Sequence, residues 1–258
     1  MKMVKKILLG LTAAAAIGFV GCKQVDDPKE AITGSNNDYS VDYENTDGEN
    51  YRAYKSTGMN HAGALVKVKF DNKDVGSSKM GVIFDLHDNA DDKEAKDFYI
   101  IGLGTTASSN IYVSKFENVT DLQADNFGTK LTTNPAHEDE LVKLGSKSIT
   151  VPTALDGSVT YYVCFKANKD GEYDWAVLNL TETEANALNI NDDDLESKIP
   201  GSSVLAHGTI ENAFDAVDSV NKIPQNKLAV YAMITPNQTL KGSWKYLGMY
   251  KEAEEIAE

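Results

Sequence analysis

Two stretches near the middle of the chain decide its fold class: Met80–Leu86, which reads MGVIFDL, and Phe98–Leu103, which reads FYIIGL. In the first, large apolar residues return at every second position, which is the period of a β-strand with one buried face. In the second, apolar residues fill nearly every position, as in a central strand that is covered on both faces. We therefore expect two consecutive strands, and one face of the first carries Met80, Val82, Phe84 and Leu86.

The same alternation continues on both sides of this region and predicts seven further strands. Glycine, asparagine and aspartate separate them, as expected for turns. Nine strands in a domain of about 200 residues form a sandwich or barrel rather than a single sheet. The predicted fold is all-β: a two-sheet antiparallel jelly-roll β-sandwich with one or two short helices. The further strands are Ala64–Phe70, Ile111–Phe116, Val159–Lys166, Trp175–Leu180, Val204–Ile210, Leu228–Ile234 and Ser243–Tyr250.

Two segments have the signals of short helices. Pro135–Leu144 carries acidic residues near its start and Lys143 near its end, which is the charge order that suits a helix dipole. Thr181 and Glu184 have the spacing of a capping box in front of Ala185–Leu188. Neither segment is typical of a recognition helix that reads nucleic acid.

The order of several strands is similar to that of a known superfamily. Gly81–Asp85 precedes a polar loop, then Asp97–Leu103 with its tyrosine and Ile111–Phe116; Lys227–Ala232 and Gly242–Gly248 have the character of closing strands. This pattern resembles the concanavalin A-like lectin and glucanase jelly rolls, which include laminin-G-like modules. The resemblance covers most of residues 52–250. It implies a jelly roll and, by analogy with the superfamily, a role associated with sugars.

The amino-terminal region has the three parts of an export signal. Lysines at positions 2, 5 and 6 precede the apolar run Ile7–Val20, and Gly21 stands before Cys22. The 14-residue run is shorter than the about 20 residues that a membrane-spanning helix needs. Residues 1–21 are therefore predicted to be a signal peptide that ends in a lipobox, with Phe19 where leucine is usual. An ordinary secretory leader that is cut near Gly21 is the alternative, and both readings export the protein.

Resemblance to bacterial lipoproteins implies that Cys22 receives a lipid and becomes the first residue of the mature protein. Two or three acyl chains hold a protein on a membrane almost irreversibly. We expect a lipid anchor in the cell envelope, at the outer membrane or cell surface, because Lys23 is not the aspartate that retains some lipoproteins at the inner membrane. Residues 22–50 are rich in polar residues and predict a flexible acidic tether, and residues 51–258 are expected to form the sandwich domain.

Charge and cysteine content narrow the possible functions. The formal net charge is −14, and removal of a leader with three lysines and no acids leaves 22 basic against 39 acidic residues. Nucleic acid is therefore not an expected partner, because its phosphates would be repelled. With Cys22 lipidated, Cys164 is the only other thiol, and its apolar, aromatic surroundings in the sequence predict a buried, inert side chain.

Exposed aromatic residues offer one route to sugar binding, since sugar rings stack on their faces. Packing in the core is the competing interpretation, and periodicity does not decide which sheet face each ring occupies. The candidate ligand-binding residues are Tyr99, Tyr112, Trp175, Trp244 and Tyr246.

Acid-rich loops offer a possible calcium site, because calcium takes six to eight oxygen ligands. The better candidate lies after the strand that contains Phe84, and a second acidic run follows the predicted helix at residues 181–188. Solvation of acidic loops on an acidic protein is the alternative. The first group comprises Asp88, Asn89, Asp91 and Asp92; the second comprises Asn191, Asp192, Asp193 and Asp194.

A catalytic site for glycoside hydrolysis has no clear counterpart in the sequence. Residues 170–174 read DGEYD, which departs from the order of acids in the glucanases, and residues 168–171 have the character of a hairpin turn. We expect a non-catalytic binding module for carbohydrate or for a host or envelope protein. An accessory or structural subunit of an envelope complex and a glycoside hydrolase-like enzyme are the alternatives.

Overall fold

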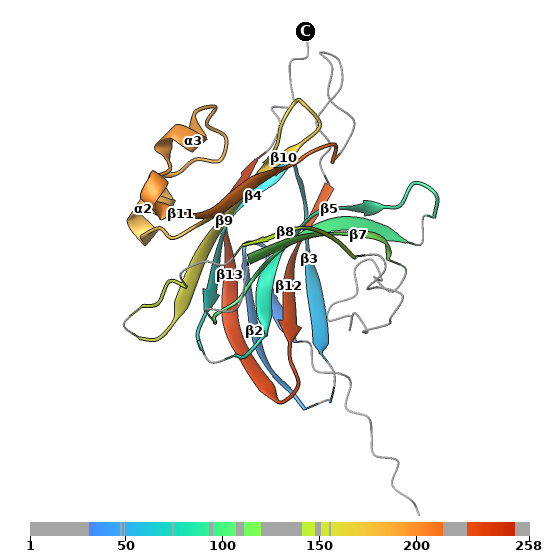
Figure 1. Ribbon diagram of the computed structural model, residues 1–258, viewed down its shortest axis with the longest axis vertical. Helices are drawn as coiled ribbons and strands as arrows, with labels where there is room; N and C mark the ends of the chain where they lie inside the picture. Colours follow the sequence, from blue (N-terminus) through green and yellow to red (C-terminus); the bar gives the residue numbers. More distant parts are fainter. Residues whose placement is uncertain are drawn as a thin grey trace, which may run out of the picture.

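The computed structural model describes residues 31–46, 48, 50–73, 75–92, 95–106, 111–119, 141–147, 151–154, 156–213 and 226–250. These residues form two antiparallel sheets that pack face to face (Figure 1). The prediction of an all-β, two-sheet sandwich with two short helices is confirmed. Its core lies between the sheets and contains most of the large buried side chains.

The seven-stranded sheet has the order β1 (Ile32–Ser35), β2 (Asp38–Asn45), β13 (Gln238–Tyr250), β4 (Gly63–Phe70), β9 (Val159–Ala167), β10 (Tyr173–Leu178) and β11 (Val204–Ile210). The six-stranded sheet has the order β3 (Tyr51–His61), β12 (Asn226–Ile234), β5 (Lys79–Asp88), β6 (Lys96–Leu103), β7 (Ile111–Val119) and β8 (Leu141–Lys147). Strands β3 and β4 are consecutive in the chain but lie in different sheets, and so do β12 and β13. All nine predicted strands are present, and β1, β2, β3 and β8 are additional.

The predicted tether over residues 22–50 is wrong for residues 32–45, which form β1 and β2. Strand β2 pairs with β13 along its whole length, and its burial alternates, with Tyr39 and Val41 in the core and Asp38 and Ser40 exposed. This is a period-two pattern in which tyrosine and valine, rather than a run of aliphatic residues, supply the buried face. The folded unit therefore begins well before residue 51.

The centre of strand β5 departs from the predicted alternation. Asp85 has a φ of 56°, and the pairing register between β5 and β6 shifts between Phe84 and His87. A bulge of this kind adds a residue to one strand and reverses the faces beyond it. Met80, Val82 and Phe84 consequently lie in the core between the sheets, whereas Leu86 packs on the opposite face of the six-stranded sheet.

Residues 181–203 cover part of the outer face of the seven-stranded sheet. They contain α2 (Glu182–Ala187), α3 (Leu195–Lys198) and a short 3-10 turn, η1 (Gly201–Ser203), and Figure 1 shows both helices in orange beside β11. Ala185 and Leu195 pack there on Tyr162 and neighbouring apolar residues of the sheet. No helix within the described ranges is long and apolar enough to cross a membrane.

The two helix predictions have different outcomes. Helix α2 begins with the predicted capping box, in which the Thr181 hydroxyl accepts from the Glu184 amide and the Glu184 carboxylate accepts from the Thr181 amide. The predicted helix over residues 135–144 is wrong at its end, because residues 141–144 belong to β8 at the edge of the six-stranded sheet. Residues 135–140 lie outside the described ranges.

Candidate functional site

A groove with a volume of about 830 Å³ opens over β9, β10 and β11, between the outer face of the seven-stranded sheet and the segment that carries α3. Its size falls in the range of small-molecule sites, about 300–1,000 Å³. Side chains of these three strands alternate between the core and the groove, so that Asp174 lines the groove while Tyr173 packs in the core. The lining is mixed, with Cys164, Ala176 and Ile199 beside charged and aromatic residues.

The carboxylate of Asp174 is held in one orientation. The hydroxyl of Thr209 on β11 donates to one of its oxygens at 2.8 Å, and Nδ2 of Asn168 in the β9–β10 turn donates to the other at 3.1 Å. Thr209 and Asn168 also line the groove. A carboxylate with two oriented oxygens retains further lone pairs, which can accept hydrogen bonds from a ligand.

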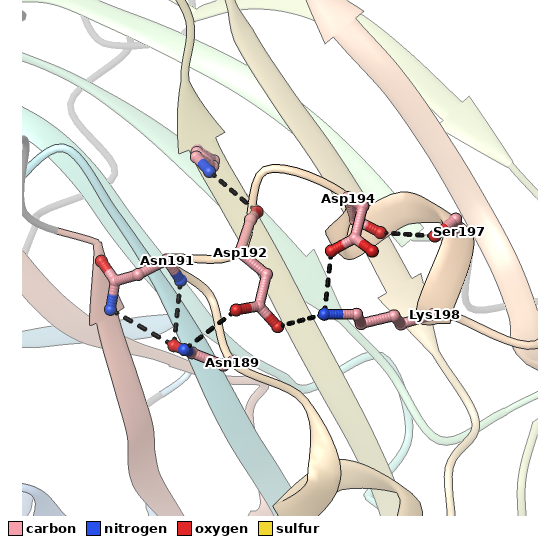
Figure 2. Close-up of polar contacts among 7 residues, drawn as sticks. Asn189, Asn191, Asp192, Asp194, Ser197 and Lys198 are labelled. Atoms are coloured by element: carbon pink, nitrogen blue, oxygen red, sulfur yellow. Dashed lines mark hydrogen bonds and ion pairs between the residues drawn. The ribbon is translucent and has the colours of Figure 1, made fainter.

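The acidic segment before α3 forms one wall of the groove and is fixed by internal contacts (Figure 2). Lys198 Nζ lies 2.7 Å from the Asp192 carboxylate and 2.8 Å from that of Asp194. Nδ2 of Asn189 donates to Asp192 at 3.1 Å, and the Lys198 ammonium holds the pKa of Asp194 below its ordinary value. Lys198 therefore compensates part of the charge of this second predicted acid cluster from within the chain.

Two aromatic residues are among those that line the groove, and their side chains differ in orientation. Trp175 is among the lining residues, but its side chain shares the face of Tyr173 and packs on the core between the sheets, where the indole lies so close to Gly208 that a Cβ built there would come 3.1 Å from two indole atoms. Tyr250 also lines the groove, with Lys166 Nζ 4.2 Å from the ring centroid. Trp175 was predicted as a ligand-binding residue, whereas Tyr250 was expected only as the end of a strand.

Three of the other predicted aromatic residues are part of the core. Tyr99, Trp244 and Tyr246 are all nearly fully buried between the sheets. Trp244 donates to the carbonyl of Gly81, and the hydroxyl of Tyr246 donates to the carbonyl of Ala229. The prediction that these three offer exposed faces to a sugar is wrong, because the alternation of each strand turns them toward the partner sheet.

Tyr112 lies elsewhere again. It packs on the outer face of the six-stranded sheet, over Gly102, and its hydroxyl is hydrogen-bonded to that of Tyr231. Burial raises the pKa of Tyr112 well above its ordinary value. Of the five predicted aromatic residues, Trp175 alone is among the residues that line the groove, and its ring packs on the core side of the sheet.

The predicted calcium residues lie at the β5–β6 connection, and several of their polar atoms have partners within the chain. Asp88 pairs with Lys96, which lowers the pKa of the Asp88 carboxyl. Oδ1 of Asn89 accepts from the amides of Asp91 and Asp92 at 2.9 and 3.1 Å. Within the described ranges, no group of three or more histidine, cysteine, aspartate or glutamate side chains is placed to hold a metal ion. Calcium binding by this loop stays a prediction.

The remaining candidate residues have simpler outcomes. Residues 168–172 form the predicted turn between β9 and β10, and Gly171 adopts a φ of 80° there. Cys164 is buried, and the burial raises its pKa to about 12, as expected of an inert thiol. Cys22 and the signal peptide lie outside the described residues.

The groove was not foreseen because it depends on a contact distant in sequence, in which residues 192–201 pack over β9 to β11. Thr209 occupies an outward position of a predicted strand, whereas Asp174 lies just before the predicted strand Trp175–Leu180, in β10 as the structure has it. Their neighbours on the wall are set by tertiary packing. A comparison of the sequence with models of known protein families finds no match, and a comparison with curated proteins finds none either.

Proposed function

We propose that this chain is an exported, lipid-anchored binding module that holds a carbohydrate in the groove over β9, β10 and β11. The observation that carries this proposal is the fixed carboxylate of Asp174 in a groove of suitable size whose wall includes the ring of Tyr250. Sugar recognition needs oriented acceptors for hydroxyl groups together with aromatic surface for the ring. Both kinds of group line this groove, where Asp174 supplies the acceptor and Tyr250 supplies the aromatic surface.

The proposed location rests on the amino-terminal sequence. A basic start, a 14-residue apolar run and Gly21–Cys22 support export and a lipid anchor on Cys22, at the outer membrane or cell surface. In this arrangement the sandwich would face glycans outside the membrane that holds it. A net negative charge disfavours anionic polymers as ligands and is compatible with neutral or cationic sugars.

A glycan array tests the function, and a soluble form that comprises residues 23–258 keeps β1 and β2 while it removes the lipidated cysteine. The array is probed with this protein in a buffer that contains calcium and again in a buffer that contains a chelator. Saturable binding to defined glycans supports the proposal. Loss of that binding in chelator, reproduced by Asp88→Ala, would locate calcium at the β5–β6 loop.

Variants place the binding in the groove. Ala176→Trp fills the groove from its floor, and Asp174→Ala removes the oriented carboxylate; both should abolish binding. Asp42→Ala is the matched control, because Asp42 is an exposed acid on β2 that pairs with Lys241 away from the groove. Absence of binding on the array, or binding that survives Ala176→Trp, would contradict the proposal and favour a protein partner. Release of new reducing ends from a bound glycan would instead identify a hydrolase.

A further inference from the structure

Asp85 places a carboxyl group in the interior, at one end of the sandwich. The residue is 2% exposed and adopts a φ of 56°, which is uncommon for residues other than glycine. Bulges often redirect a side chain toward a functional position, and a strained backbone that persists needs support from its surroundings. The bulge in β5 turns Asp85 toward the other sheet.

The carboxyl group connects three strands. The hydroxyl of Tyr173, the first residue of β10, donates to Oδ1 from the seven-stranded sheet at 3.3 Å. Nδ2 of Asn226, the first residue of β12, donates to the same oxygen from the neighbouring strand. Asp85 therefore joins the beginnings of β10 and β12 to the bulge in β5.

Few charges compensate an ionised Asp85. His87 follows on the same strand, with Nδ1 3.8 Å from Oδ1 and a side chain that is 38% exposed. Lys115 approaches from β7 but is paired with Glu117, and Tyr99 lies on β6. In the described part of the chain, no lysine or arginine forms an ion pair with Asp85.

The remaining contacts at this end are apolar and aromatic. Phe84 packs on Phe165 at 4.6 Å between ring centroids and on Tyr173 at 5.2 Å. An ionised carboxylate in such surroundings loses the water molecules that would solvate it. The two neutral donors, Tyr173 and Asn226, replace this hydration only in part. The neutral carboxyl group still has an oxygen that accepts hydrogen bonds from Tyr173 and Asn226. Because it carries no charge, its burial does not incur that cost of lost hydration.

We propose that Asp85 is a pH-sensitive latch: its neutral form keeps the starts of β10 and β12 on β5, and its ionised form favours an opened state in which the carboxylate regains water, even though both donors bond a carboxylate more strongly than a neutral carboxyl group. Tyr173 is followed directly by Asp174 of the groove, so the latch acts at the strand that carries the groove carboxylate. The latch itself is independent of what the groove binds.

The direction of the pH effect follows from the burial. Burial raises the pKa of Asp85 above its ordinary value of 3.8, although Asn226, His87, Tyr173 and Lys115 act in the opposite direction. The folded chain then holds this proton more tightly than the unfolded chain does. The stabilising contribution is complete below the ordinary value and is lost as the pH rises through the raised value.

A carbon NMR titration of the aspartate carboxyl groups in residues 23–258 tests the latch, with the Asp85 signal identified by its loss in Asp85→Asn. We expect a midpoint above 3.8, together with faster amide exchange at the starts of β10 and β12, corrected for intrinsic rates, as Asp85 ionises. Asp85→Asn should remove this pH-dependent exchange. Asp88→Asn, which changes an exposed acid on the same strand, should leave it in place.

Tyr173→Phe provides a second test that does not depend on how well Asp85→Asn folds. It removes a donor that favours the charged carboxylate, and should therefore shift the Asp85 midpoint to higher pH. A midpoint at or below 3.8, an unchanged midpoint in Tyr173→Phe, or pH-dependent exchange that persists in Asp85→Asn would each overturn the proposal.

Discussion

The indole nitrogen of Trp244 donates a hydrogen bond of 2.8 Å to the main-chain carbonyl of Gly81. Trp244 belongs to β13 and Gly81 to β5, so this bond joins the two sheets through the core. The Trp244 side chain is 1% exposed.

Substitution of Trp244 should therefore lower stability rather than ligand affinity alone. Trp244→Ala leaves a large cavity and should lower the free energy of unfolding by about 3–5 kcal/mol. Trp244→Phe keeps an aromatic ring and removes the donor, so that it should cost less, with about 1–3 kcal/mol from the unpaired carbonyl. Urea unfolding of residues 23–258 measures both. Unchanged midpoints would show that Trp244 is not in the core.

Removal of β1 and β2 should destroy the folded state. Tyr39 on β2 packs edge to face on Tyr246 at 6.3 Å, and β2 provides the outer hydrogen-bonding partner of β13. A chain that starts at Tyr51 exposes that strand and its apolar neighbours. We expect it to aggregate or to lose cooperative thermal unfolding, whereas residues 23–258 unfold cooperatively. Equal unfolding midpoints for the two chains would support the tether interpretation instead.

Gly102 should be intolerant of any side chain, because Tyr112 lies over it. A Cβ at residue 102 would come 2.2 Å from Cζ of Tyr112, so Gly102→Ala must displace the ring from the six-stranded sheet. We expect a loss of about 1–3 kcal/mol in the free energy of unfolding, as for overpacking elsewhere. Gly201→Ala is the matched control, since nothing lies within 4 Å of its Cβ. A similar unfolding midpoint for both variants would contradict this packing.

Cys164 should react slowly with thiol reagents in the folded protein. Its pKa of about 12 leaves little thiolate near neutral pH, and the side chain is buried. In a chain with Cys22→Ser, labelling by a disulfide reagent at pH 8 should be at least about 100-fold faster after unfolding in urea. Comparable rates in the two states would show that the thiol is accessible.

Period-two alternation predicted the strands whose inward residues are aliphatic, such as β4 and β5, because burial on one face is a local property of the sequence. It missed β2, where Tyr39 and Val41 supply the buried face among acidic residues. The orientation of the predicted aromatic residues depends on which sheet face is covered, and this is decided by pairing between distant strands. For the same reason the bulge at Asp85 and the groove wall at residues 192–201 were not predictable from local pattern.

An NMR titration of isotopically labelled residues 23–258 with the tightest glycan from the array identifies the surface that binds it. We predict that amide shift changes concentrate in residues 164–176 and 192–209, which contain the groove residues Asp174 and Thr209, and that Ala176→Trp eliminates them. Shift changes confined to the outer face of the six-stranded sheet, around Tyr54 and Tyr231, would contradict the assignment of the groove as the binding site.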